Sequence, residues 1–284
     1  MVRKRKFGER MGAIPAPNLG LDEISIDLQT RVWNLCHDWL FPLSSNDHEI
    51  YMEEMRALYE EMGWPGHQIP WQVSNGRNWV ADQILGPDIP WYRFYQFAEC
   101  IPRLRAVTLT SPSHQQEVYD QMRLALNSAL EQEGSPYRMA VDELVPITNV
   151  EELAEIREAV VTPERFTMAG EHMAAALAHL AQRPQPNYHD TIKQAFSAVE
   201  SVLWTAIGDK PKMPEAIRRF DDRFGPIHAA LRQMIEKLHG YASDEEGVRH
   251  AATERADVGE PEARLMVVSC SGMVNFLVRK VLSF

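Results

Sequence analysis

The stretch "EARLMVVSCSGMVNFLVRKVL" (residues 262–282) decides the fold class of this 284-residue chain. Its apolar residues recur every three or four positions, as in a helix that buries one face. That face consists of Met266, Cys270, Val274, Leu277 and Val281. The spacing predicts a final helix at roughly 261–282 that packs in a core made of other helices.

The same helical periodicity runs through most of the preceding sequence. It predicts two helices within 21–62, separated at "LFPLSSND", and further helices at 91–106, 113–133, 150–160, 163–183, 190–207 and 227–238. Thr148 or Asn149 is expected to cap the helix that carries Val150, Leu153, Ile156 and Val160 as one apolar stripe. A loop that contains Pro211 and Pro214 is expected before the helix at 227–238.

One short segment has the periodicity of strands instead. In "YRMAVDELVPIT" (137–148), apolar and polar residues alternate on either side of Asp142–Glu143. This pattern predicts a small hairpin. The fold class is therefore mainly α: a helical amino-terminal domain with one small β-hairpin, followed by a helical bundle. The predicted domains are 1–162 and 163–284.

Tryptophan is concentrated in one part of the chain, because five of the seven lie between residues 39 and 91. Such a cluster can form an exposed recognition surface. More often it builds a compact core in which the indole N–H groups have hydrogen-bond acceptors. We favour the core.

The composition is that of a globular protein of one large or two ordinary domains, with 45% hydrophobic and 24% charged residues. No apolar signal core follows the basic start, and no apolar run suggests a membrane span. We therefore expect a cytoplasmic protein with no membrane partner. Three scattered cysteines and the absence of a histidine- or cysteine-rich motif give no reason to expect a disulfide framework, a metal site or a cofactor.

Charge is distributed unevenly along the chain. Residues 1–20 contain five basic residues and one acid, which gives this segment a net charge of +4. Because the net charge of the whole chain is −11, the other residues together carry −15. An acidic body argues against broad duplex binding, which needs a wide basic face. It permits a small site that grips one or two phosphates. The basic start could contact RNA, although a solvated terminus is the more common role.

The segment "SDEEGVRHA" (243–251) carries the main chemical candidate. Ser243 and Glu246 have capping-box spacing, which explains the acids as a helix start. Arg249 and His250, however, are the residue types that metal-free RNA cleavage needs: imidazole accepts the 2′-hydroxyl proton, and guanidinium holds the phosphate. Asp244, Glu245 or Glu246 could orient either one. Spacing alone favours the cap, because adjacent residues on a helix do not face each other.

Other polar clusters give weaker signals. Arg223 and His228 have four residues between them, and His228 is expected simply to begin the next helix. His172 and His179 are expected to be solvated, and Cys270 to be a buried packing residue rather than a nucleophile.

Several stretches resemble one family. "RKFGERMG" (5–12), "EISIDLQTRVWNL" (23–35) and "LNSALEQEGSPYRMAVDELVPITNVEELAEI" (126–156) resemble the amino-terminal domain of one class of AbiJ-type abortive-infection proteins. "NYHDTIKQAFSAVESV" (187–202), "IHAALRQMIEKLHGYASDEEGVRHA" (227–251) and "EARLMVVSCSGMVNFLV" (262–278) are similar to the HEPN-like domain that accompanies it.

The resemblance implies a toxin-type effector of antiviral defence against phage, with a HEPN bundle that forms a homodimer and cleaves RNA without metal. It favours a functional role for Arg249 and His250. HEPN nucleases usually separate the arginine and the histidine by several residues, whereas the two are adjacent here. Two hypotheses therefore stay open: a HEPN ribonuclease, or a non-catalytic HEPN module that binds nucleotides, or acts as a scaffold or sensor beside a partner protein of a defence system.

Overall fold

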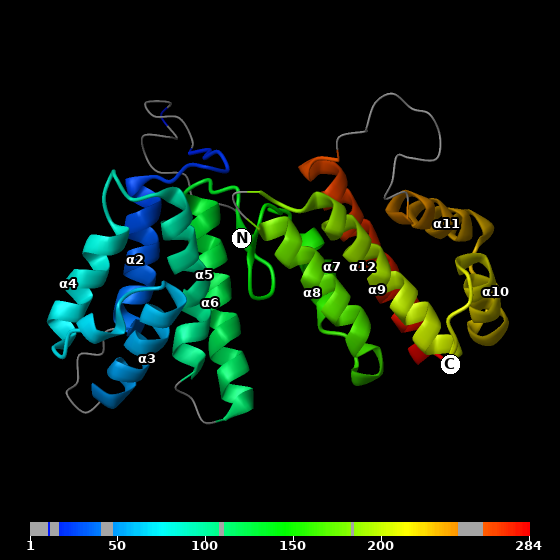
Figure 1. Cartoon of the computed structure of the whole chain (residues 1–284), viewed down its shortest axis with the longest axis horizontal. Helices are drawn as coiled ribbons and strands as arrows, with labels where there is room; N and C mark the ends of the chain where they lie inside the picture. Colours follow the sequence, from blue (N-terminus) through cyan, green and yellow to red (C-terminus); the bar gives the residue numbers. More distant parts are fainter. Residues whose placement is uncertain (1–10, 12–16, 41–47, 108–110, 183–184, 244–257) are drawn as a thin grey trace. The chain divides into compact units, whose positions relative to one another are not determined.

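The structure is a computed structural model that describes residues 11, 17–40, 48–107, 111–182, 185–243 and 258–284. The described residues form a mainly helical protein with one two-stranded hairpin, as predicted (Figure 1). The chain divides into two compact units, Met1–Thr148 and Asn149–Phe284.

Among its described residues, the first unit contains five α-helices and the hairpin. The helices are α2 (Ile26–Leu40), α3 (His48–Glu61), α4 (Val73–Ile84), α5 (Trp91–Val107) and α6 (Pro112–Gln132), with the short 3-10 helix η2 (Gly66–Gln68) between α3 and α4. Strands β1 (Arg138–Met139) and β2 (Leu144–Val145) pair antiparallel, with Met139 opposite Leu144. This confirms the predicted hairpin, although each strand is only two residues long.

The core of the first unit is made by apolar stripes at helical spacing. Leu28, Val32 and Cys36 of α2 are buried, as are Met55 and Leu58 of α3. The helices α2, α5 and α6 pack against one another around these stripes. The helical periodicity of this half is therefore the periodicity of its core.

The tryptophan-rich segment only partly matches the expected core. Trp64 and Trp79 pack edge to face, with ring centroids 4.8 Å apart, whereas Trp71 is 71% exposed. The N–H of Trp64 is buried and has no hydrogen-bond partner among the described residues. The prediction that the indole N–H groups are satisfied is therefore wrong at Trp64.

The second unit is helical throughout its described residues. Its elements are α7 (Val150–Val160), the 3-10 helix η3 (Glu164–Phe166), α8 (Thr167–Ala181), α9 (Tyr188–Ile207), α10 (Met213–Phe224), α11 (Ala229–Ser243) and α12 (Glu260–Leu282). Asn149 caps α7, since its Oδ1 accepts from the N–H of Glu152 at 2.9 Å. The helix α9 ends at Gly208, whose φ of +74° favours glycine.

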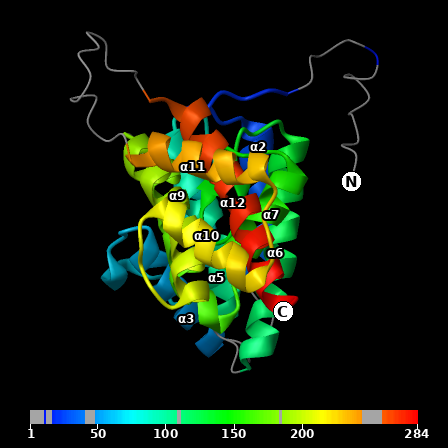
Figure 2. The ribbon, with the colours of Figure 1, turned by 90° about the vertical axis from the view of Figure 1, so that its right-hand side faces the viewer.

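The helices α7, α8, α9 and α12 pack together, and α12 contacts each of the other three. All five residues of its predicted apolar face, from Met266 to Val281, are buried. Gly170 lets α8 approach the end of α7, because a Cβ there would lie 2.3 Å from the backbone oxygen of Val160. The helices α10 and α11 lie to one side of α9 and α12 (Figures 1 and 2).

Three details of this unit differ from the sequence prediction. The helix α10 occupies a region that is expected from the sequence to be a loop. Pro214 is compatible with this helix because it lies in the first turn, where proline is tolerated. Val150 is 67% exposed, although it was assigned to the apolar stripe of α7. In α11, Leu231 and Met234 are exposed and Ile235 is buried, because few residues of α9 and α10 cover this helix.

Candidate functional site

The predicted site residues Asp244, Glu245, Glu246, Arg249 and His250 lie outside the described residues, as do the basic residues among 1–10. What the structure does describe are the two flanks of 244–257. The chain leaves α11 at Ser243, which is the last residue of that helix and begins no described helix. The chain returns at Val258 and enters α12 at Glu260.

The two flanks lie close enough to interact electrostatically. Partial burial raises the pKa of Tyr241 in the last turn of α11, and the negative charge of Glu262 in α12 adds to this shift. Glu262 also accepts a hydrogen bond from the N–H of Gly259 at 3.0 Å, which caps α12. Acids in this first turn suit the helix dipole.

An imidazole–carboxylate pair lies in the last turns of α11. Nε2 of His239 lies 3.6 Å from Oε1 of Glu200 on α9, and the His239 ring packs on Phe196 with centroids 5.5 Å apart. Burial raises the pKa of the Glu200 carboxyl above its ordinary value, and positive charge on His239 and His172 opposes that shift. An imidazole beside a carboxylate is an arrangement that acid–base chemistry uses.

His172 on α8 belongs to the same cluster. Its Nδ1 lies 2.7 Å from Oε1 of Gln194 on α9. His172 is half-buried, so the expectation that it is merely solvated is wrong. We call His172, Glu200 and His239 the histidine–glutamate cluster.

Sequence reasoning missed this cluster for a physical reason. Phe196 and Glu200 are four residues apart, so they share one face of α9, and that much is visible in the sequence. Nothing in the periodicity indicates that His239 of another helix covers that face. The contact depends on how α11 packs on α9.

Arg223 and His228 have separate roles. Nη1 of Arg223 donates to the backbone oxygen of Ala206 at 2.9 Å. His228 precedes α11: its Nδ1 accepts from the N–H of Ala230 at 3.2 Å, and its backbone oxygen accepts from the N–H groups of Leu231 and Arg232. This confirms that His228 begins a helix.

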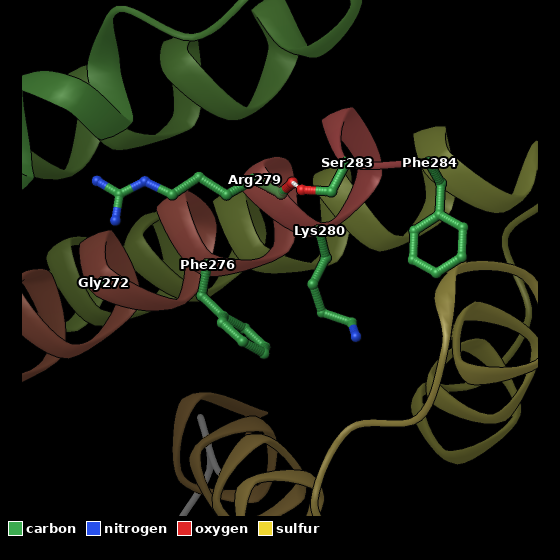
Figure 3. A pocket seen from close by; sticks show the side chains of 6 residues that line it. All are labelled: Gly272, Phe276, Arg279, Lys280, Ser283 and Phe284. Carbon is green, nitrogen blue, oxygen red and sulfur yellow. Dashed lines mark hydrogen bonds between the residues drawn. The ribbon is translucent and has the colours of Figure 1, made fainter.

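An open pocket of about 410 Å³ lies along the second half of α12. Its lining residues are Gly272, Phe276, Arg279, Lys280, Ser283 and Phe284. Phe276 and Lys280 point to the same side of the helix, whereas Arg279 points to another side (Figure 3). Arg279 forms an ion pair with Glu158, while no ion pair is described for Lys280. Lys280 is therefore the cation that a ligand in this pocket would meet.

The remaining candidates carry no chemistry in the described chain. Cys36, Cys100 and Cys270 are buried free thiols, and burial raises the pKa of Cys270 to about 12. Cys270 is therefore a packing residue, as predicted, rather than a nucleophile. Among the described residues, no three histidine, cysteine or acidic side chains form a group that could hold a metal ion.

The helix α12 is also long and apolar enough to cross a bilayer, judged by length and composition alone. Of the 18 residues that form the most apolar part of this helix, 56% are buried inside the protein. Asn275 and Ser271 are buried within that part and hydrogen-bonded. These are the contacts of a helix that packs within a bundle.

Comparison with known proteins identifies a family for the first part of the chain. Residues 5–162, more than half of the chain, match the family described as AbiJ N-terminal domain 4. The match ends at the end of α7 and does not cover the histidine–glutamate cluster. No match was found among curated proteins or among solved structures.

Proposed function

Because the chain belongs to the AbiJ N-terminal domain 4 family, which implies an abortive-infection role against phage, we propose that its carboxy-terminal unit is a HEPN ribonuclease. The proposed reaction cleaves RNA without a metal ion. The 2′-hydroxyl loses its proton to an imidazole and attacks the adjacent phosphorus atom. The 5′-oxygen then leaves with a proton from a second acid, and a 2′,3′-cyclic phosphate remains.

The observation that carries this proposal is the contact between His239 and Glu200. It places a carboxylate beside an imidazole, four residues before the segment 243–251 that contains Arg249 and His250. In the proposed site, His250 is the base or acid and Arg249 holds the phosphate through its planar guanidinium. His239 is the second acid–base group.

The pocket on α12 supports RNA as the substrate. Phe276 is 37% exposed and Phe284 is 79% exposed, and Lys280 lines the same pocket. Proteins that bind single-stranded RNA combine aromatic rings, on which bases stack, with cations that contact phosphates. A small basic site of this kind is compatible with the net charge of −11.

We further propose that the protein is a cytoplasmic homodimer, paired through its carboxy-terminal unit and without a membrane partner. Apolar side chains of α11 and α12 support the proposed interface, since Leu231, Met234, Tyr241 and Leu265 are all at least 40% exposed. Exposed apolar patches of this kind commonly mark interaction sites. Light scattering should give twice the monomer mass at micromolar concentration, and a strict monomer would contradict this assembly.

The alternative is a HEPN module that does not cleave RNA. Arg249 and His250 are adjacent, which favours a module that binds nucleotides, or acts as a scaffold or sensor beside a partner protein of a defence system. The pocket on α12 suits a bound nucleotide as well as it suits RNA. Catalysis therefore has to be tested separately from binding.

The test is incubation of the purified protein with total RNA in EDTA. The wild type should degrade RNA, and the double variant Arg249→Ala/His250→Ala should not. Arg165→Ala/His189→Ala is the matched control, because both residues are exposed in the same unit and lie outside the proposed site. Wild-type protein that binds RNA or a nucleotide without cleaving it would favour the alternative.

A further inference from the structure

The first unit contains a second pocket, which has no part in the proposed cleavage. It has a volume of about 500 Å³ and lies between α3 and η2. Met52, Arg56, Tyr59 and Glu60 line it from one face of α3, and Trp64, Gly66 and Ile69 line it from the segment that follows. A Cβ added to Gly66 would have no atom within 4 Å, so the pocket is open at that residue.

Aromatic rings form a fixed wall at this pocket. Tyr59 stacks on Trp79 of α4 with ring centroids 4.8 Å apart. The ring of Trp64 is nearly perpendicular to both and makes a T-shaped contact with each. Met52 and Ile69 add apolar surface. A wall of this kind suits a flat, ring-shaped ligand, since aromatic faces stack on heterocycles.

Two hydrogen-bond donors at this wall are left without acceptors. The hydroxyl of Tyr59 and the N–H of Trp64 are both buried, and neither has a hydrogen-bond partner among the described residues. Buried donors are nearly always paired in folded proteins, because an unpaired buried donor has lost its water and gained nothing. Both donors belong to residues that line the pocket, so a ligand that brings acceptors to them would supply the hydrogen bonds that they lack.

The rim of the pocket carries one charge of each sign. Arg56 and Glu60 are exposed and one helical turn apart, and no ion pair is described for either. A guanidinium at the rim recognises a phosphate. A carboxylate beside it accepts hydrogen bonds from sugar hydroxyls.

From these features, we propose that the pocket between α3 and η2 binds a mononucleotide. The base would insert at the aromatic wall and present ring nitrogens or carbonyl oxygens to Tyr59 and Trp64. The phosphate would lie at Arg56 and the ribose at Glu60. The volume is within the range of small-ligand sites. The site gives the amino-terminal domain a sensing role that is independent of RNA cleavage in the other unit.

The test is isothermal titration calorimetry of the full chain with AMP, GMP, CMP and UMP, each compared with its nucleoside and with inorganic phosphate. The protein carries Arg249→Ala, His250→Ala and Lys280→Gln, so that neither the proposed nuclease site nor the pocket on α12 contributes. At least one mononucleotide should bind saturably, and its nucleoside should bind more weakly. Failure of RNA cleavage would leave this result unchanged.

Tyr59→Phe separates a ligand-binding role from a structural one. It removes the unpaired hydroxyl and keeps the ring, so the melting temperature of the free protein should stay the same or rise. The association constant for the nucleotide should fall about tenfold, the equivalent of one lost hydrogen bond. Arg56→Gln should weaken nucleotide binding and leave nucleoside binding unchanged.

Tyr92→Phe and Arg93→Gln are matched controls, because both residues are exposed on α5 and outside the pocket. Neither control should change the association constant. The proposal is overturned if no mononucleotide binds at millimolar concentration. It is equally overturned if Tyr59→Phe and Arg56→Gln bind the nucleotide as tightly as the two controls do.

Discussion

The side-chain amide of Asn275 on α12 donates to two oxygens of Glu155 on α7, the backbone oxygen at 2.9 Å and Oε2 at 2.7 Å. Asn275 is buried, so this contact lies inside the second unit. Two ion pairs run alongside it between the same helices, Glu152 with Arg264 and Glu158 with Arg279. The helix α7 therefore packs with the carboxy-terminal unit, although the family match that begins at residue 5 includes it.

Replacing Asn275 with alanine should destabilise the protein by about 1–3 kcal/mol, because two part-buried oxygens of Glu155 lose their donor. Urea unfolding followed by circular dichroism measures this change. Gln233→Ala is the control, since it removes an exposed amide from α11 of the same unit. Equal midpoints for the two variants would show that the contact contributes nothing.

The position of α7 also predicts how the chain can be divided. A fragment 149–284 keeps α7 on α12, whereas a fragment 163–284 exposes the face of α12 that α7 covers. The longer fragment should unfold cooperatively and at a higher temperature. If 163–284 melts at the same temperature as 149–284, α7 does not stabilise the carboxy-terminal unit.

Glu99 should make stability depend on pH. Burial raises the pKa of this carboxyl from 4.5 to about 7, although the N–H of Leu144 donates to it. A raised folded-state pKa means that Glu99 favours folding below pH 4.5 and that this contribution is lost as the pH rises towards 7. Glu99→Gln should therefore stabilise the protein above pH 7, by up to about 3 kcal/mol, and have little effect at pH 4.

Thermal melts across this pH range test the Glu99 prediction. Glu53→Gln is the control, because Glu53 is exposed on α3. A stability difference between Glu99→Gln and wild type that is the same at pH 4 and pH 8 would contradict the assigned pKa.

RNA binding should depend on the pocket on α12. Lys280→Gln should lower the slope of log K against log salt by about 0.7, the value for one phosphate contact to a single strand. Phe276→Ala should weaken binding by about 1–3 kcal/mol, the usual contribution of one stacked base. Lys237→Gln, an exposed lysine on α11, should leave the slope unchanged. If Lys280→Gln and Lys237→Gln behave alike, RNA does not use this pocket.

Sequence periodicity was sufficient for elements that bury one continuous face. The helix α12 and the hairpin were predicted with nearly correct bounds, because each has a regular pattern over its full length. The helix α10 was missed, because its proline was interpreted as part of a loop although a first-turn proline is compatible with a helix.

Sites assembled from several helices could not be predicted in this way. Glu200 and His239 are 39 residues apart and meet only because α11 packs on α9. The pocket between α3 and η2 depends on the turn that brings Trp64 beside Tyr59. Periodicity gives the face on which a side chain lies, and it does not give the partner that covers that face.

The histidine–glutamate cluster predicts that the proposed cleavage depends on Glu200. Glu200→Gln removes the carboxylate whose Oε1 lies 3.6 Å from Nε2 of His239. The cleavage rate should then fall, because the His239 imidazole loses the negative charge beside it. Cleavage rates across pH for wild type, Glu200→Gln and the control Glu236→Gln, an exposed acid of α11, measure this effect. Identical profiles would remove His239 from the proposed site.

The chemical form of the RNA ends tests the ribonuclease proposal most directly. RNA cut by the wild-type protein in EDTA should end in a 2′,3′-cyclic phosphate, and a 2′-deoxy residue at the cut position should block cleavage, because the neighbouring hydroxyl is the proposed nucleophile. His250→Ala should produce no such ends, and Arg249→Lys should restore little, since lysine lacks the planar fork. Cleavage by His250→Ala at the wild-type rate, or cleavage at the 2′-deoxy residue, would contradict the account.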